Sequence, residues 1–130
     1  MPLVRIDLRE GKSPDYGARV GDVVYHAMLQ HLNVPQHDRF QIITTHPANG
    51  LNFDREYLGI QRSDDCVFLQ ITLNGGRTTE MKQSFYKAVA DGLNESLNLR
   101  REDVFISLVE VQKEDWSFGN GIAQYATRSS

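Results

Sequence analysis

Pro2 directly follows the first methionine of the sequence. Methionine is commonly removed when a small residue such as proline follows it, and Pro2 would then carry a free secondary amine. Such an amine can act as a base, as an acid once protonated, or as a nucleophile that forms an iminium with a carbonyl. An ordinary α-amino group titrates at about pH 7.7–8.0, so its neighbours would decide among these roles.

Four other chemically capable residues are expected to lie near Pro2 because of the directions of the predicted strands. Asp38 immediately precedes a second strand, Arg77 follows a third strand, and Trp116 and Phe118 follow a fourth. Parallel strands begin at the same end of a sheet, which places Asp38 beside Pro2. A pseudo-two-fold axis would relate the two halves, so the strands of the second half run opposite to those of the first. The second-half strands therefore end where the first-half strands begin. We therefore predict that all five residues converge at one end of the sheet.

This arrangement rests on an internal repeat with an offset of 65 residues. The offset aligns identical or similar residues over the whole of each half: Ile6 with Ile71, Leu8 with Leu73, 11–13 with 76–78, 32–33 with 97–98, Asp38 with Asp103, and Phe40 with Phe105. The period is too long for a solenoid of stacked repeats. We therefore predict a single domain over residues 1–130, built from one repeat at 1–65 and another at 66–130.

Each repeat has the pattern of a strand, a helix and a second strand. Residues 3–8 alternate between apolar and polar, and residues 40–45, 66–73 and 104–111 are the other predicted strands. Apolar residues at three- and four-residue steps predict helices, the first opened by Ser13-Pro14 and the second capped by Thr78. Strands that alternate with helices imply right-handed crossovers between parallel strands.

These elements predict an α/β (α+β) fold. Duplicated β-α-β units form a four-stranded mixed sheet with two helices on one face, and oligomerisation would cover the other face. Gly119-Asn120-Gly121 predicts a C-terminal hairpin that could pair with the sheet edge of a neighbouring subunit. Residues 46–65 form a long connection, of the kind that is usually functional or mobile.

The composition excludes several classes of protein. The 130 residues carry 14 Lys and Arg against 17 Asp and Glu, a formal charge of -3 that argues against binding the nucleic acid backbone. No apolar run approaches the length of a membrane span, and no export signal is visible, so we expect a cytoplasmic protein. The single Cys66 excludes an internal disulfide and a cysteine-based metal site. His26 and His31 are five residues apart, which does not fit a helical metal pair.

Several of these pieces together resemble the tautomerase superfamily, in the branch of the malonate semialdehyde decarboxylases. The matching segments span nearly the whole chain and occur in family order: Pro2-Leu3, Val34-Pro35, 38–41, 58–63, 76–78 and 115–119. The combination is specific, whereas any single segment would be weak. Some members have two arginines before the second helix, and the earlier of these positions is Gly75 here.

The resemblance implies a tautomerase-like homotrimer. It also implies catalysis by an amino-terminal proline, without a metal or an organic cofactor. Pro2 would be the catalytic amine, Asp38 its carboxylate partner, and Arg77 the group that binds a substrate carboxylate. Trp116 and Phe118 would form the pocket walls. The implied reaction is decarboxylation or hydration of a small 3-oxo acid such as malonate semialdehyde.

Two other functions stay open at this point. A neutral Pro2 could act as a general base in a keto–enol tautomerase of a 2-oxo acid such as phenylpyruvate. The chain could also be a non-enzymatic, trimeric binding module, in which Trp116 and Phe118 are core or interface aromatics. Asp38 could then be a plain turn residue, and Arg77 a solvated residue at the helix start.

Overall fold

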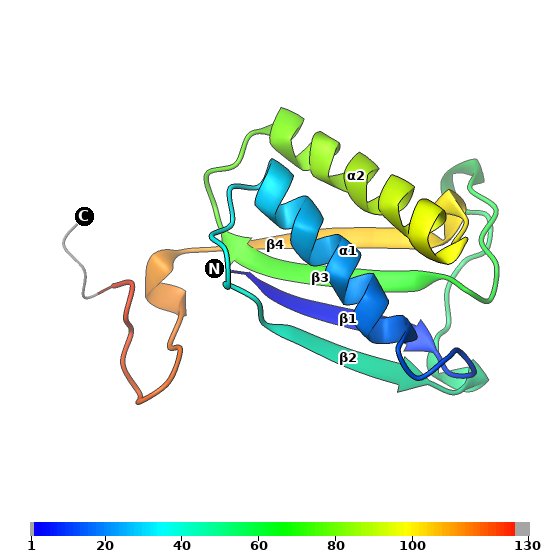
Figure 1. The fold of residues 1–130 in the computed structure, drawn as a ribbon, viewed down its shortest axis with the longest axis horizontal. Coiled ribbons are helices and arrows are strands. Elements are labelled where there is room, and N and C mark those ends of the chain that lie inside the picture. The colour runs from blue at the N-terminus through cyan, green and yellow to red at the C-terminus, as the bar shows by residue number, and fades with distance from the viewer. Residues whose placement is uncertain (1, 127–130) are drawn as a thin grey trace.

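Four strands and two long helices alternate along the chain in a computed structural model that describes residues 2–126 (Figure 1). The elements are β1 (Leu3–Arg9), α1 (Tyr16–His31), β2 (Gln41–His46), β3 (Val67–Asn74), α2 (Thr79–Leu97) and β4 (Val104–Val111). Four short 3₁₀ turns complete them: η1 (Ala48–Gly50), η2 (Tyr57–Gly59), η3 (Arg101–Asp103) and η4 (Lys113–Asp115). The four predicted strands are confirmed to within one residue at each end.

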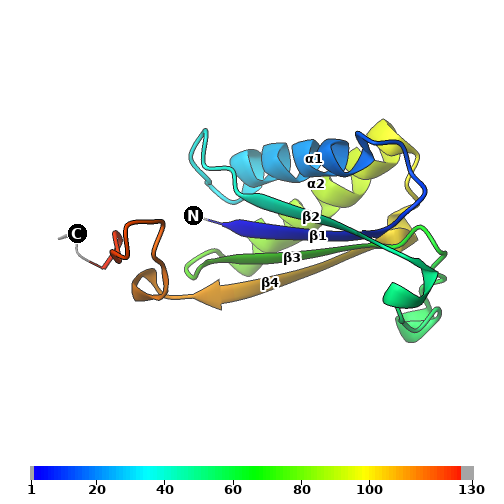
Figure 2. The same ribbon diagram turned by 90° about the horizontal axis from the view of Figure 1, so that it is seen from below.

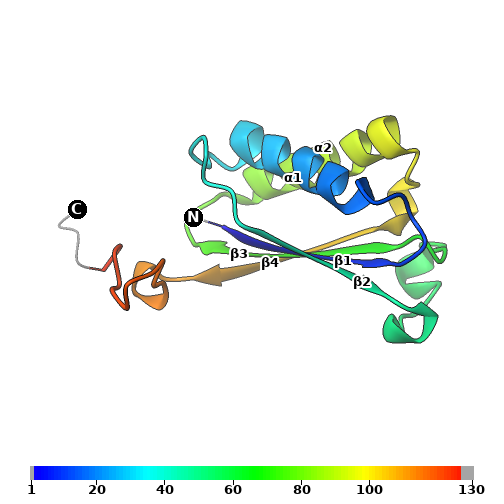
Figure 3. The ribbon, with the colours of Figure 1, turned by 60° about the horizontal axis from the view of Figure 1, so that its bottom comes forward.

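The strands form one mixed sheet in the order β2-β1-β3-β4. β1 is parallel to β2 and β3 is parallel to β4, while the two central strands, β1 and β3, are antiparallel. This pairing is the predicted one, and it brings the beginnings of β1 and β2 to the same end of the sheet as the ends of β3 and β4. Both helices lie on one face, and no element of residues 2–126 covers the other face (Figures 2 and 3).

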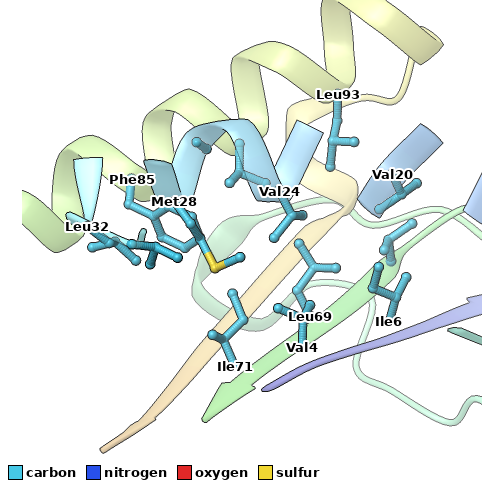
Figure 4. Close-up of a cluster of buried hydrophobic side chains, with 14 of the residues drawn as sticks. Val4, Ile6, Val20, Val24, Met28, Leu32, Leu69, Ile71, Phe85 and Leu93 are labelled. Carbon is cyan, nitrogen blue, oxygen red and sulfur yellow. The ribbon is translucent and has the colours of Figure 1, made fainter. Parts of the chain in front are cut away.

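The core lies between the central strands and the two helices (Figure 4). Alternate residues of β1 and β3 point toward the helices, and the predicted apolar helix stripes meet them. The largest fully buried side chains on the two sides are those of Phe85, Ile6, Met28, Leu32, Leu69, Ile71, Leu73 and Leu93. Burying each such side chain stabilises the fold by about 1.5–3 kcal/mol, so this layer fixes the helices on the sheet.

The two helices begin differently. The Thr78 hydroxyl accepts a hydrogen bond from the Met81 amide, 3.2 Å away, and so caps α2 as predicted. The prediction that Ser13 opens α1 is wrong, because its hydroxyl donates to the Asp15 carboxylate at 2.8 Å. As a result α1 begins only at Tyr16, and its N-cap, Asp15, makes no side-chain capping bond.

The predicted C-terminal hairpin is only partly correct. Asn120 and Gly121 both have positive φ angles, of 60° and 68°, and so form the expected tight turn. No strand flanks that turn within residues 112–126, because the Gln124 side chain occupies the groups that a partner strand would use. It accepts from the Phe118 amide and donates to the Gly119 carbonyl, both at 2.9 Å.

A buried carboxylate anchors the long connection between β2 and β3. Asp103 is fully buried and accepts hydrogen bonds from the Ser63 amide at 2.7 Å and the Ser63 hydroxyl at 2.5 Å. Arg62 ties the same connection together by donating to the carbonyls of Tyr57 and Ile60. The connection therefore lies ordered at the end of the sheet that is remote from Pro2 (Figure 3). None of the helices within residues 2–126 is long and apolar enough to cross a membrane.

Replacing Ser63 with Ala should lower the free energy of unfolding by about 1.5–3 kcal/mol, because one donor to a buried charge is lost. Urea unfolding at a fixed protein concentration measures the change. Ser84→Ala, at an exposed position of α2, is the matched control and should change stability by less than about 0.5 kcal/mol. Equal values for the two variants would contradict the anchoring role.

The single cysteine should be unreactive in the folded protein. Cys66 is fully buried, and burial raises the pKa of its thiol to about 11, so almost no thiolate is present at neutral pH. A chromogenic disulfide reagent at pH 7.5 should therefore react at least about 100-fold more slowly with native protein than with protein in urea. Fast labelling without unfolding would show that the chain opens locally at Cys66, just before β3.

Candidate active site

Pro2 lies buried at the end of the sheet where β1 and β2 begin. The Val4 amide donates to the Phe40 carbonyl at 2.9 Å, which holds the chain just after Pro2 against the approach to β2. A cavity of about 250 Å³ opens here, and its lining is mostly apolar: Pro2, Leu3, Phe40, Trp116, Ser117 and Phe118. The structure thus brings three of the five predicted residues, Pro2, Trp116 and Phe118, to one cavity.

The aromatic wall of this cavity is built by the segment that follows β4. The rings of Trp116 and Phe118 stack with centroids 5.4 Å apart, and Tyr125 packs edge-on against Phe118 at 4.8 Å. The Trp116 indole donates to the Asn74 side-chain oxygen at 2.8 Å. This bond ties the wall to the end of β3, since Asn74 is the last residue of that strand.

Arg77 lies half-buried between β3 and α2 and is held by backbone carbonyls alone. Its Nε donates to the Leu32 carbonyl at 2.9 Å, and its Nη1 donates to the Asn74 carbonyl at 2.8 Å. Within residues 2–126 no carboxylate oxygen lies at ion-pair distance from it. Three of its five N–H groups take no part in these two bonds.

Asp38 lies in the connection between α1 and β2, on a turn closed by a bond from its amide to the Pro35 carbonyl at 3.2 Å. Its side chain is buried, with 8% of the residue exposed. Burial raises the pKa of the Asp38 carboxyl, and the positive charge of Arg77 acts in the opposite direction. The charges of Asp38 and Arg77 thus interact, although neither residue lines the cavity itself.

Sequence reasoning did not identify Asn74, Leu3, Phe40 or Ser117 as site residues. Asn74 could have been found, because it ends the strand that Arg77 follows and therefore lies at the predicted end of the sheet. Phe40 was predicted only as a strand residue, yet it is 51% exposed and forms one side of the cavity. A Cβ at Gly75 would lie 2.9 Å from a Glu110 carboxylate oxygen, so a side chain there would require the flexible Glu110 side chain to move.

The 65-residue offset relates each site residue to a counterpart at the opposite end of the sheet. The charged side chains of these counterparts have hydrogen-bonding or ion-pair partners. Lys12, the counterpart of Arg77, forms an ion pair with Asp65 at 2.6 Å. Asp103, the counterpart of Asp38, is bonded to Ser63.

Aromatic rings fill the space at this opposite end. Phe68, the counterpart of Leu3, packs between Phe53 and Phe105, and both pairs of ring centroids are 5.2 Å apart. Phe53 and Phe105 are themselves the counterparts of Phe118 and Phe40. The equivalent of the cavity is therefore occupied by side chains.

Replacing Asp38 with Asn should stabilise the folded protein at pH 7. A carboxyl whose pKa is raised by folding contributes stability below its unfolded pKa, of about 3.9, and loses that contribution as the pH rises. The gain from the uncharged amide should therefore be largest near neutrality and shrink toward pH 4. Urea unfolding of both proteins at the two pH values measures it, and a variant that is less stable than wild type at pH 7 would contradict the expectation.

Two family models match the chain, and both carry the description "Tautomerase enzyme". One matches residues 38–119 and the other residues 2–60. The Probable tautomerase YusQ of Bacillus subtilis (strain 168) is 40% identical over 124 residues, which cover 95% of this chain and 98% of the relative. The Probable tautomerase YrdN of the same organism is 37% identical over 127 residues, or 98% of each chain.

Solved structures agree with this relationship. FG41 malonate semialdehyde decarboxylase, inhibited by 3-bromopropiolate, superposes with a TM-score of 0.89 at 38% identity, over 96% of this chain and 95% of that one. A fused 4-OT, solved as a symmetric trimer, has a TM-score of 0.77 at 22% identity and covers 97% and 99% of the two chains, which shows a shared fold. From the family matches and the two close relatives, this chain belongs to the tautomerase superfamily.

Proposed function

We propose that the protein is a cofactor-independent decarboxylase or hydratase of a small 3-oxo acid such as malonate semialdehyde. The observation that carries this proposal is the Arg77 guanidinium, which no carboxylate of residues 2–126 pairs, at the sheet end that holds the Pro2 cavity. An unneutralised, half-buried cation beside an apolar cavity favours a small carboxylate ligand. The 38% identity to FG41 malonate semialdehyde decarboxylase supports the same substrate class.

In this proposal Arg77 holds the substrate carboxylate, and the capped N-terminus of α2 adds to the attraction. Protonated Pro2 donates a hydrogen bond to the aldehyde oxygen. The bond between the carboxyl carbon and C2 breaks, carbon dioxide leaves, and the electron pair passes to the aldehyde oxygen as an enolate. Protonation at C2 then gives acetaldehyde. Alternatively, neutral Pro2 attacks the aldehyde carbon, water is lost, and the resulting iminium accepts the same electron pair to give an enamine. Protonation of this enamine at C2 and hydrolysis by water then release acetaldehyde and the free amine of Pro2.

The protonation state of Pro2 depends on its neighbours. The charge of Asp38 favours the cation, whereas burial and the charge of Arg77 favour the neutral amine. The apolar walls formed by Trp116 and Phe118 exclude water and strengthen both influences. A tenfold change in the ratio of protonated to neutral Pro2 corresponds to about 1.36 kcal/mol. Small changes in the distances from Pro2 to Asp38 and Arg77 therefore decide whether the amine acts as an acid or as a base.

A keto–enol tautomerase of a 2-oxo acid such as phenylpyruvate is the second candidate function. The family description and the names of both bacterial relatives favour it. In that reaction neutral Pro2 removes a proton from the carbon next to the carbonyl and returns it to the oxygen or the carbon. Titration of the Pro2 amine discriminates, because a pKa above neutrality supports the cationic mechanism and a pKa below supports the base.

We also propose that the chain assembles as a homotrimer through the uncovered face of the sheet. Apolar side chains remain exposed on that face, with Ile42 at 42% and Phe105 at 46% exposure. A fused 4-OT of the same fold was solved as a trimer. Association would remove this apolar area from water, which is the usual driving force for such interfaces.

Activity measurements on a panel of 3-oxo and 2-oxo acids test the proposed function. Arg77→Ala should lower kcat/KM by about 100-fold or more, as expected when a charged hydrogen bond to the substrate is lost. Pro2→Ala should lower kcat with a smaller change in KM. Arg101→Ala is a matched control, since Arg101 pairs with Asp91 on the surface, and it should retain full activity.

Borohydride reduction in the presence of the best substrate, followed by peptide mapping, reports the iminium route. Intact mass measurement of the same preparation shows whether Met1 has been removed. Loss of activity in Pro2→Ala but not in Arg77→Ala would contradict the carboxylate-binding role. Absence of turnover with every acid, together with no adduct on Pro2, would favour the binding module instead.

A further inference from the structure

We propose that Asn74, the last residue of β3, is a positioning residue that fixes the aromatic wall and the guanidinium of the site relative to each other. Its side-chain oxygen accepts the Trp116 indole N–H, and its backbone carbonyl accepts Arg77 Nη1, both at 2.8 Å. One residue thus holds a pocket wall and the proposed carboxylate-binding group. This inference rests on the proposed function and adds a residue to it.

The orientation of the Asn74 amide follows from its partner. An indole nitrogen can only donate a hydrogen bond, so the oxygen of the amide must face Trp116 and the NH₂ group must face away. Within residues 2–126 that NH₂ group makes no hydrogen bond. Its two donors are therefore left for a ligand or for water at the half-buried end of the strand.

The strand register places Asn74 close to Pro2. Leu3 lies opposite Thr72 in the antiparallel pair of β1 and β3, so the next position outward sets Pro2 opposite Leu73. Asn74 is one residue further along the same strand. Opposite residues in such pairs have Cα atoms about 4.5–5.5 Å apart. Asn74 therefore follows the residue that faces Pro2, at the same end of the sheet as the wall and the guanidinium.

Trp116 is the only tryptophan in the chain, so its fluorescence reports this contact directly. Asn74→Leu removes the acceptor but keeps the backbone carbonyl that binds Arg77. Asn74→Asp keeps an acceptor for the indole but adds a negative charge beside Arg77. Asn52→Leu, at an exposed position in the connection remote from Pro2, is the matched control.

The measurements are acrylamide quenching of Trp116, the Kd of malonate as a non-reacting dicarboxylate probe, and KM and kcat with the best oxo acid. In Asn74→Leu the quenching constant should rise about twofold or more, and KM and the malonate Kd should rise about 3- to 10-fold, the range for one lost hydrogen bond. In Asn74→Asp quenching should stay at the wild-type value, while the malonate Kd rises more than in Asn74→Leu. A purely structural role would move quenching and affinity together in both variants.

The inference is overturned if Asn74→Leu matches Asn52→Leu in both quenching and malonate affinity, or if Asn74→Asp binds malonate as tightly as wild type. Failure of the proposed function gives a different result. In that case the wild-type protein turns over no oxo acid, while the quenching comparison still reports whether Asn74 holds Trp116.

Discussion

The Arg77 guanidinium is fixed by two backbone carbonyls, and the arrangement of the site depends on that contact. One carbonyl belongs to Leu32 at the end of α1, and the other belongs to Asn74 at the end of β3. The contact therefore joins the two halves of the chain at the same end of the sheet where Pro2 lies. Because both acceptors are uncharged, these two bonds hold the cation in place without neutralising it.

Asp38 shows the cost of keeping such a site available. Its carboxylate is buried within the influence of the Arg77 charge, and burial raises its pKa. Groups in this state destabilise the fold slightly and are typical of places where chemistry occurs. Asp103, the counterpart of Asp38 at the opposite end of the sheet, accepts hydrogen bonds from Ser63 and stabilises the connection between β2 and β3.

Much of the fold was predictable from local pattern. The alternation of residues 3–8 and the stripes of the two helices set the strands, their faces and the core, and strand direction alone predicted the end at which the site residues gather. The start of α1 was not predictable, because Ser13 has a competing partner in Asp15. The tail was mispredicted for a similar reason, since the Gln124 side chain takes the bonds of a second strand. The position of Asn74 at the end of the strand before Arg77 was available from the sequence, but its contact with Trp116, 42 residues away, is encoded by no local pattern.

The filled end of the sheet limits what an assembly of these chains can do. The internal repeat gives the sheet two related ends, each of which could in principle hold a cavity. At one of them the rings of Phe53 and Phe68 fill the space, and Lys12 is paired with Asp65. Each chain therefore has one open end of this kind, and a threefold complex would hold three proposed sites rather than six. An engineer seeking a second centre would first have to empty that end, and would lose the ring packing that stabilises the connection from β2 to β3.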